Sequence, residues 1–337
     1  MKVLVTGGCG FIGRILVTRL TELGYRIVIL DRRNPVQVGL SFDGEVANVV
    51  GDIRDPEAIN RAFTGDIEAV IHLAAVTSVL KSKLDPDETF YTNLFATHLL
   101  LERARQLDTK IFVMASTNAV AGSVGENLIS ELTPLNPLTP YGATKAAAEM
   151  LMSAYTDFTG LKCCPVRLTN VYGPGMGEKD SFIPRLIRAA LAQDEITIYG
   201  DGLQVRDFVS VHDAVAGLIM PLSGDICGPL TIGSGSSISV LDLHRAVCEV
   251  TKRNIQIVHG PEQAGEMRAV RVDIGRARTF GFEPRVSLTD GLADLPPYCF
   301  SHFRAISLTR SSVMATSIRA FFGGWSFPYI SVISAFH

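Results

Sequence analysis

The chain opens with a short apolar strand that runs straight into a glycine-rich loop and a helix. The strand is predicted at residues 2–6, the loop carries Gly7, Gly10 and Gly13, and a helical spacing of apolar residues follows it. A second apolar strand ends at Asp31. Such glycines let a pyrophosphate approach a helix N-terminus, and an acid about 20 residues on can bind a ribose diol. The pattern predicts a dinucleotide-binding unit.

Residues 31–33 bear on which dinucleotide is bound. The Asp31 carboxylate would repel a 2′-phosphate and so favours NAD, whereas Arg32 and Arg33 are able to meet such a phosphate. We predict NAD as the cofactor and keep NADP as the alternative.

Strand and helix patterns then alternate along the chain. Further strands are predicted at residues 46–50, 69–75, 110–114 and 162–168, and long helices at residues 89–107 and 140–158. This order predicts an α/β fold with a doubly wound parallel sheet, whose ligand sites lie at the carboxyl ends of the strands. Asp52, Ser116, Thr117 and Asn170 all follow such ends.

Composition restricts the classes of partner. The 337 residues carry a net charge of −3, which gives no indication of nucleic-acid binding, and no segment has the pattern of a membrane span. The six cysteines have no metal or disulfide spacing. Because of this cysteine spacing we expect a metal-free protein. No leader sequence is evident ahead of the first strand, so we also expect a cytoplasmic location.

Tyr141 and Lys145 are four residues apart and therefore share one face of the helix that begins at Pro140. A nearby ammonium favours the phenolate and lowers a tyrosine pKa that is normally about 10. The pair predicts that Tyr141 accepts a proton near neutral pH. A surface tyrosine without a catalytic role is the alternative.

An ordered series of motifs resembles the extended short-chain dehydrogenase/reductases, in particular the NAD-dependent nucleotide-sugar epimerase/dehydratase group typified by UDP-glucose 4-epimerase. The motifs are Thr6-Gly-Gly-Cys-Gly-Phe-Ile-Gly13, Gly51-Asp-Ile53, His72-Leu-Ala-Ala75, Asn93, Ser116-Thr117, Tyr141-x-x-x-Lys145, Arg167-x-x-Asn170-Val-Tyr-Gly-Pro174, Ile198-Tyr-Gly-Asp-Gly202 and Arg206-Asp-Phe-Val-x-Val-x-Asp213. The resemblance implies a Rossmann NAD-binding domain over residues 1–170, with strands returning from the later chain. It also implies a smaller C-terminal nucleotide-sugar-binding domain over residues 171–295. The tail, residues 296–337, does not resemble the family.

The same resemblance implies roles for individual residues. Tyr141 would be the catalytic base, Lys145 its partner that also holds the nicotinamide ribose, and Thr117 the group that binds the reacting sugar hydroxyl. Tyr141 would take the O4 proton while a hydride leaves C4 for NAD, and return of the hydride to the other face of the 4-keto sugar inverts C4. Cofactor contacts are implied for Gly7, Gly10, Phe11, Ile12, Gly13, Asp31, Arg32, Asp52, Ile53, Leu73, Ala74, Ala75, Asn93 and Ser116. Substrate contacts are implied for Thr77, Asn170, Phe182, Arg185, Thr197, Tyr199, Arg206 and Arg268.

The two residues after Thr117 distinguish branches of the group. The 4,6-dehydratases carry Asp and Glu there, and UDP-glucuronate decarboxylases carry Glu in the second position. This chain has Asn118 and Ala119, which cannot transfer protons. We therefore predict a UDP-sugar 4-epimerase that acts on UDP-glucose/UDP-galactose or on UDP-glucuronate/UDP-galacturonate. The alternatives are a 4-ketoreductase, a 4,6-dehydratase and a non-catalytic NAD-binding protein.

Two expectations concern the substrate and the assembly. Arg185 and Arg188, in the helix after residues 180–184, are candidate partners for a hexuronate carboxylate. However, the basic residue that bacterial glucuronate epimerases carry shortly after Tyr-Gly-Pro is absent from residues 175–177. The resemblance also implies a homodimer formed through the helices at residues 89–107 and 141–158.

Overall fold

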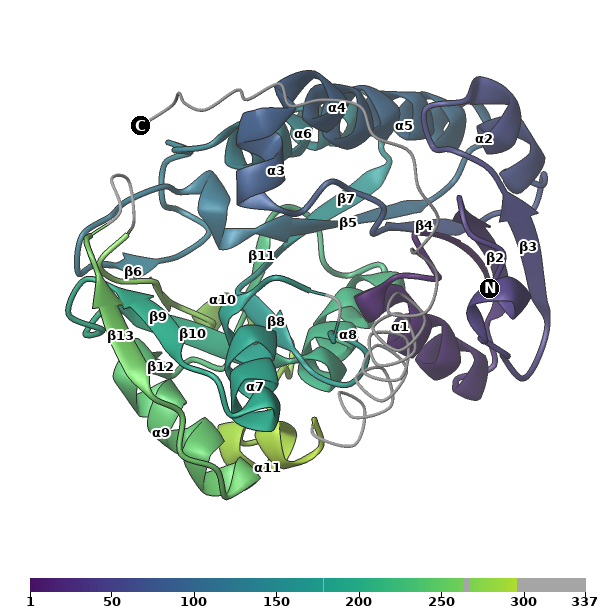
Figure 1. The fold of residues 1–337 in the computed structure, drawn as a ribbon. Coiled ribbons are helices and arrows are strands. Elements are labelled where there is room, and N and C mark those ends of the chain that lie inside the picture. The colour runs from purple at the N-terminus through teal and green to yellow at the C-terminus, as the bar shows by residue number, and fades with distance from the viewer. Residues whose placement is uncertain (178, 263–266, 296–337) are drawn as a thin grey trace, which may run out of the picture.

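The computed structural model describes residues 1–177, 179–262 and 267–295. Its centre is a seven-stranded parallel sheet in the order β11-β7-β5-β4-β1-β2-β3 (Figure 1). The strands are β1 (Lys2–Thr6), β2 (Arg26–Asp31), β3 (Val46–Val50), β4 (Ala69–His72), β5 (Ile111–Thr117), β7 (Lys162–Leu168) and β11 (Leu230–Ile232). The order reverses at β1, so the carboxyl ends of β1 and β4 border the crevice where such sheets bind ligands.

Helices cover both faces of this sheet because its strands are apolar on both sides. In β1, Val3 and Val5 pack on the face covered by α1 (Phe11–Glu22), α8 (Val211–Ile219) and α10 (Gly275–Thr279). Leu4 points the other way, toward α2 (Pro56–Ala62), α5 (Ala96–Gln106) and α6 (Pro140–Thr159). Near-continuous apolar strands are typical of parallel sheets buried between two helical layers.

A second core lies beside the sheet and is built mainly from the later chain (Figure 1). Its helices are α7 (Phe182–Ala192), α9 (Val240–Thr251) and α11 (Leu288–Ala293). Its strands form the small sheets β12-β10-β8 and β13-β9, with β8 (Asn170–Tyr172), β9 (Ile196–Tyr199), β10 (Val205–Ser210), β12 (Ser237–Ser239) and β13 (Ile257–Gly260). A further pair joins β14 (Arg271–Val272) to β6 (Leu128–Ile129).

The structure confirms the predicted α/β fold with a doubly wound parallel sheet. It differs in the helix predicted at residues 89–107, which consists of α4 (Pro86–Phe90), a π-helical turn at Tyr91–Phe95 and α5. The preceding α3 (Val79–Leu84) packs against α4 and α6. The tail at residues 296–337 lies outside the described residues.

Across the described residues, no helix is both long and apolar enough to cross a membrane.

Candidate active site

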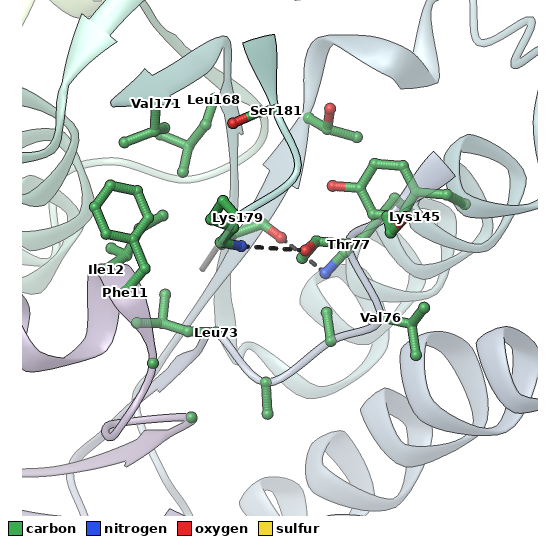
Figure 2. Close-up of a pocket in the computed structure, with 18 of the residues that line it drawn as sticks. Phe11, Ile12, Leu73, Val76, Thr77, Lys145, Leu168, Val171, Lys179 and Ser181 are labelled. Carbon is green, nitrogen blue, oxygen red and sulfur yellow. Dashed lines mark hydrogen bonds between the residues drawn. The ribbon is translucent and has the colours of Figure 1, made fainter. Parts of the chain in front are cut away.

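A cavity of about 970 Å³ opens at the carboxyl ends of the central strands (Figure 2). Its walls include the ends of β1, β2, β4, β5 and β7 and residues from the later chain. Most of the residues implied for the cofactor and several implied for the substrate line it together: Gly7, Gly10, Phe11, Ile12, Gly13, Asp31, Arg32, Asp52, Ile53, Leu73, Ala74, Ala75, Thr77, Ser116, Thr117, Tyr141, Lys145, Asn170 and Arg206.

The glycine loop sits where side chains would collide with backbone. A Cβ on Gly13 would lie 2.2 Å from the Gly7 carbonyl oxygen, and one on Gly7 would lie 2.8 Å from the Ala74 nitrogen. Helix α1 starts directly after Gly10, which provides no side-chain cap for the first amide groups. Uncapped amides at a helix N-terminus suit a pyrophosphate, so this end of the cavity fits the cofactor implied by the sequence.

Asp31 is fixed at the end of β2 by two backbone amides. Its Oδ2 accepts a hydrogen bond from the Cys9 nitrogen and its Oδ1 accepts one from the Arg33 nitrogen, each at 2.9 Å. The carboxylate therefore faces the cavity in one orientation, with lone pairs remaining for the hydroxyl groups of a ribose. These contacts suit NAD, although the Arg33 side chain also lies 3.5 Å from Asp31.

Tyr141 and Lys145 lie in the first turns of α6, whose start is well specified. Thr139 caps the helix by accepting a hydrogen bond from the Gly142 nitrogen, and Pro140 occupies the first turn. Thr117, the last residue of β5, hydrogen-bonds Tyr141. The base, its cationic neighbour and a hydroxyl group thus share one wall of the cavity.

The pKa of Tyr141 is raised, whereas the sequence predicted that it would be lowered. Burial raises the pKa of Tyr141, and the influence that lowers this pKa is the hydrogen bond with Thr117. The Lys145 Nζ instead donates to the Ala115 carbonyl oxygen at 2.8 Å. Burial lowers the pKa of Lys145 to about 8, because a charged amine is poorly solvated there.

Lys179 lines the cavity, although no sequence motif indicated it. Its Nζ lies 3.4 Å from the Thr77 hydroxyl and 6.0 Å from the centre of the Phe11 ring (Figure 2). Burial lowers the pKa of Lys179. In the described part of the chain, no carboxylate forms an ion pair with Lys179. Its positive charge is therefore not neutralised within this part of the chain, which suits an anionic ligand.

Arg188 holds the segment that carries Lys179. From α7, its Nη1 donates to the carbonyl oxygens of Gly177 at 2.8 Å and Lys179 at 3.1 Å. Because both bonds reach backbone, they fix the position of this segment independently of its side chains.

Other residues implied for substrate binding lie elsewhere. Arg268 pairs with Asp201 on the surface, with the shorter contact at 2.9 Å, which explains why it does not reach the cavity. Of the described residues, Phe182, Arg185, Thr197, Tyr199 and Arg268 are outside the cavity lining, being carried by α7, β9 or the segment before β14. Their roles in substrate binding stay predictions.

Asn93, implied for the cofactor, lies behind the cavity wall rather than in it. It sits within the π-helical turn, is fully buried, accepts a hydrogen bond from the Val76 nitrogen at 2.8 Å and donates one to the Val76 oxygen at 2.9 Å. Val76 does line the cavity. Asn93 therefore shapes the site through the loop after β4.

We expect Asn93→Ala to lower the free energy of unfolding by about 1–3 kcal/mol, because it leaves two backbone groups of Val76 without their partner. Urea denaturation measures this loss. NAD affinity should fall in parallel as the loop loosens. Thr144→Val, which removes only the 3.3 Å contact with Asn93 and a local bond to Tyr141, should cost less. An unchanged free energy of unfolding in Asn93→Ala would contradict this account.

Comparison with known proteins agrees with the geometry. A sequence model of the NAD dependent epimerase/dehydratase family matches residues 3–225. A putative UDP-glucose 4-epimerase from Methanocaldococcus jannaschii is 32% identical over 300 residues, which cover 86% of this chain and 95% of that protein. Relatives named UDP-glucuronic acid decarboxylase 4, from Arabidopsis thaliana, and dTDP-glucose 4,6-dehydratase, from Streptomyces niveus, are 29% and 30% identical.

Solved structures are similar over nearly their whole length. MoeE5 in complex with UDP-glucuronic acid and NAD is 35% identical with a TM-score of 0.81, covering 90% of this chain and 100% of that one. The UDP-glucose 4-epimerase of Thermus thermophilus in complex with NAD is 31% identical with a TM-score of 0.82, covering 89% and 99%. The chain therefore belongs to the NAD-dependent epimerase/dehydratase family and is an enzyme that uses NAD.

Proposed function

We propose that this enzyme is a UDP-sugar 4-epimerase. The observation that carries the proposal is the composition of one wall of the cavity. Tyr141, Lys145 and Thr117 lie there together, and the adjoining Asn118 and Ala119 offer an amide and a methyl group. Proton exchange at a single hydroxyl needs only the first three residues, whereas dehydration needs a further acid and base.

The carboxylates that line the cavity do not supply that acid and base. Among the described residues they are Asp31, Asp52 and Asp180. Asp31 accepts hydrogen bonds from backbone amides, and Asp52 is held by Arg54 at 2.7 Å, which lowers the pKa of Asp52. The Asp180 side chain is 84% exposed. This distribution disfavours a 4,6-dehydratase or a decarboxylase.

The residues of this chain define the protein's part in the reaction. The glycine loop, Asp31 and Lys145 would hold NAD, which when bound supplies reversible two-electron oxidation at C4 of the sugar. Tyr141 would remove the proton from the O4 hydroxyl and later return it. Thr117 would orient that hydroxyl, and Lys145 would stabilise the phenolate. Because oxidation and reduction balance, the reaction consumes no cofactor.

We propose a UDP-hexuronate as the preferred substrate. The C6 carboxylate of such a sugar requires a cation, and Lys179 provides one inside the cavity, on a segment fixed by Arg188. Arg185 and Arg188, the two candidates from the sequence, both lie outside the cavity lining, and Arg188 donates to backbone carbonyl oxygens instead. UDP-glucose is the second candidate, with Lys179 then serving the diphosphate.

The proposal is tested by incubating purified protein and NAD separately with UDP-glucuronate and UDP-glucose and then separating the products chromatographically. We expect UDP-galacturonate from UDP-glucuronate, with no net change in nicotinamide absorbance. A 4-keto-6-deoxy or pentose product would show dehydration or decarboxylation instead. Net oxidation or reduction of the nicotinamide would identify a ketoreductase.

We also propose a homodimer. Apolar side chains remain exposed on the face formed by α4, the π-helical turn and α6, including Phe90, Tyr91, Phe95, Met150 and Phe158. Such a patch is typical of an interface between subunits. Light scattering tests the oligomeric state. A cytoplasmic location stays a prediction from the sequence.

A further inference from the structure

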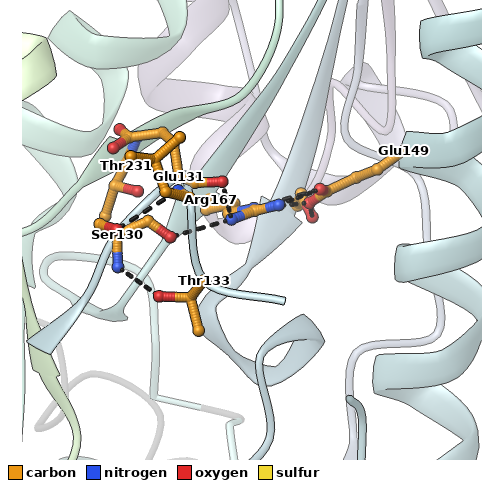
Figure 3. A network of polar contacts seen from close by, with 8 residues as sticks. Ser130, Glu131, Thr133, Glu149, Arg167 and Thr231 are labelled. Atoms are coloured by element: carbon orange, nitrogen blue, oxygen red, sulfur yellow. Dashed lines mark hydrogen bonds and ion pairs between the residues drawn. The ribbon is translucent and has the colours of Figure 1, made fainter. Parts of the chain in front are cut away.

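A buried ion pair joins α6, the helix that carries Tyr141 and Lys145, to β7 (Figure 3). Glu149 of α6 and Arg167 of β7 meet at 2.8 Å, and each side chain is only 3% exposed. The Arg167 Nε lies within 3.2 Å of both carboxylate oxygens, and its Nη1 donates to the carbonyl oxygens of Ser130 and Glu131. The pair is therefore fully enclosed and hydrogen-bonded on both sides.

Glu149 contacts one residue of the cavity lining, Ser116, and lies near a second, Lys145. The Ser116 hydroxyl donates a hydrogen bond to the Glu149 carboxylate, and Ser116 is the residue that pairs with Arg167 between β5 and β7. Lys145 lies one helical turn before Glu149 on the same face of α6 and donates to Ala115, the neighbour of Ser116. A displacement of the carboxylate would thus change the hydrogen bond of Ser116 and the electrostatic environment of Lys145.

We propose that Glu149 is a positioning residue, which orients the Ser116 hydroxyl and keeps the Lys145 side chain in its cationic form during turnover. The inference rests on the proposed epimerase function, because it concerns the partner of the base Tyr141. Arg167 has a different task, to hold the Glu149 carboxylate in place.

The charges around Lys145 explain why a carboxylate is needed there. Burial opposes its positive charge, and Glu149 is the group that raises its pKa in return. Burial lowers the pKa of His72 on β4 to about 3, so its imidazole is neutral. Burial raises the pKa of Tyr141 on α6, so its phenol is protonated and neutral before it reacts. Arg167 on β7 and Lys179 from across the cavity are cations. Among the described residues around Lys145, Glu149 supplies the negative charge that compensates the ammonium.

The test compares Glu149→Gln with Arg167→Gln. Both break the ion pair, but only the first removes the carboxylate. Lys145 must be protonated to support Tyr141, so activity should fall as the pH rises through the pKa of Lys145. We expect this alkaline limb of the kcat profile to move about one pH unit or more to lower pH in Glu149→Gln, and not to move lower in Arg167→Gln. Equal downward shifts, or no shift in Glu149→Gln, would overturn the proposal.

A second comparison covers the case in which Glu149→Gln does not fold because it leaves a buried guanidinium unpaired. The double variant Glu149→Gln/Arg167→Gln differs from Arg167→Gln only in the carboxylate. Its Lys145 should titrate at lower pH, as measured by the ¹⁵Nζ chemical shift assigned with Lys145→Met. Identical titrations would overturn the proposal. This measurement requires no turnover, so it separates failure of Glu149's role from failure of the epimerase assignment.

Discussion

Replacing Tyr141 by Phe should lower kcat by roughly a thousandfold while NAD affinity changes only a few-fold. A positioned general base contributes about 10²–10⁴ to the rate, and Phe retains the ring but not the oxygen that exchanges the proton. The ring volume at the start of α6 is preserved, so the fold and the glycine loop should be undisturbed. Product formation from UDP-glucuronate and UDP-glucose measures the loss, and fluorescence titration measures NAD affinity.

Tyr155→Phe is the matched control for this variant. Tyr155 also belongs to α6, but it packs in the core under the sheet, where its hydroxyl donates to Glu102. Removing that hydroxyl should affect stability and leave kcat within about twofold. If Tyr141→Phe kept more than a tenth of the wild-type kcat, Tyr141 would not be the base, and the proposed chemistry would need another proton acceptor.

The sequence predicted the first half of the central sheet well because its signals are local. The run from β1 through α1 to β2 combines apolar strands, a glycine loop and helical spacing, so each element supports its neighbour. The edge strand β11 is only three residues long and pairs with β7, about 60 residues earlier in the chain. Such a strand is specified by tertiary pairing, which leaves little trace in its own sequence.

The predicted helix at residues 89–107 shows a second limit. Its apolar spacing suits one continuous helix, and no glycine or proline interrupts it after Pro86. The π-helical turn arises where buried Asn93 bonds both backbone groups of Val76. Only the position of the facing loop reveals that requirement. The motif identified Asn93 as functional, but its placement behind the wall needed the structure.

The residues of the candidate site likewise fall into those that the sequence predicted and those that only the structure revealed. Asp52 and Thr117 were found because the carboxyl ends of parallel strands converge, a rule that needs no side-chain geometry. Lys179 was missed because its position depends on two backbone contacts from Arg188, which belongs to the following helix, α7. Similarly, the pKa of Tyr141 depends on burial and on where the Lys145 amine points, neither of which follows from a spacing of four residues.

Lys179→Met should lower kcat/KM for UDP-glucuronate roughly 10- to 100-fold and change kcat/KM for UDP-glucose less than about threefold. A charge-assisted hydrogen bond is worth about 1.5–3 kcal/mol, and only the hexuronate presents a carboxylate to lose it. Met preserves most of the aliphatic stem, so its packing near Phe11 should persist. Initial rates with both sugars, each with saturating NAD, give the ratio.

Two further variants decide what Lys179 binds. Lys179→Arg keeps the positive charge and should restore most of the activity on UDP-glucuronate. If Arg185 recognised the carboxylate instead, Arg185→Ala would show the selective loss, although Arg185 lies outside the cavity. Equal losses for both sugars in Lys179→Met would place the cation at the diphosphate, which both substrates share. The preference for a hexuronate would then lose its structural basis, while the roles proposed for Tyr141, Lys145 and Thr117 would stand.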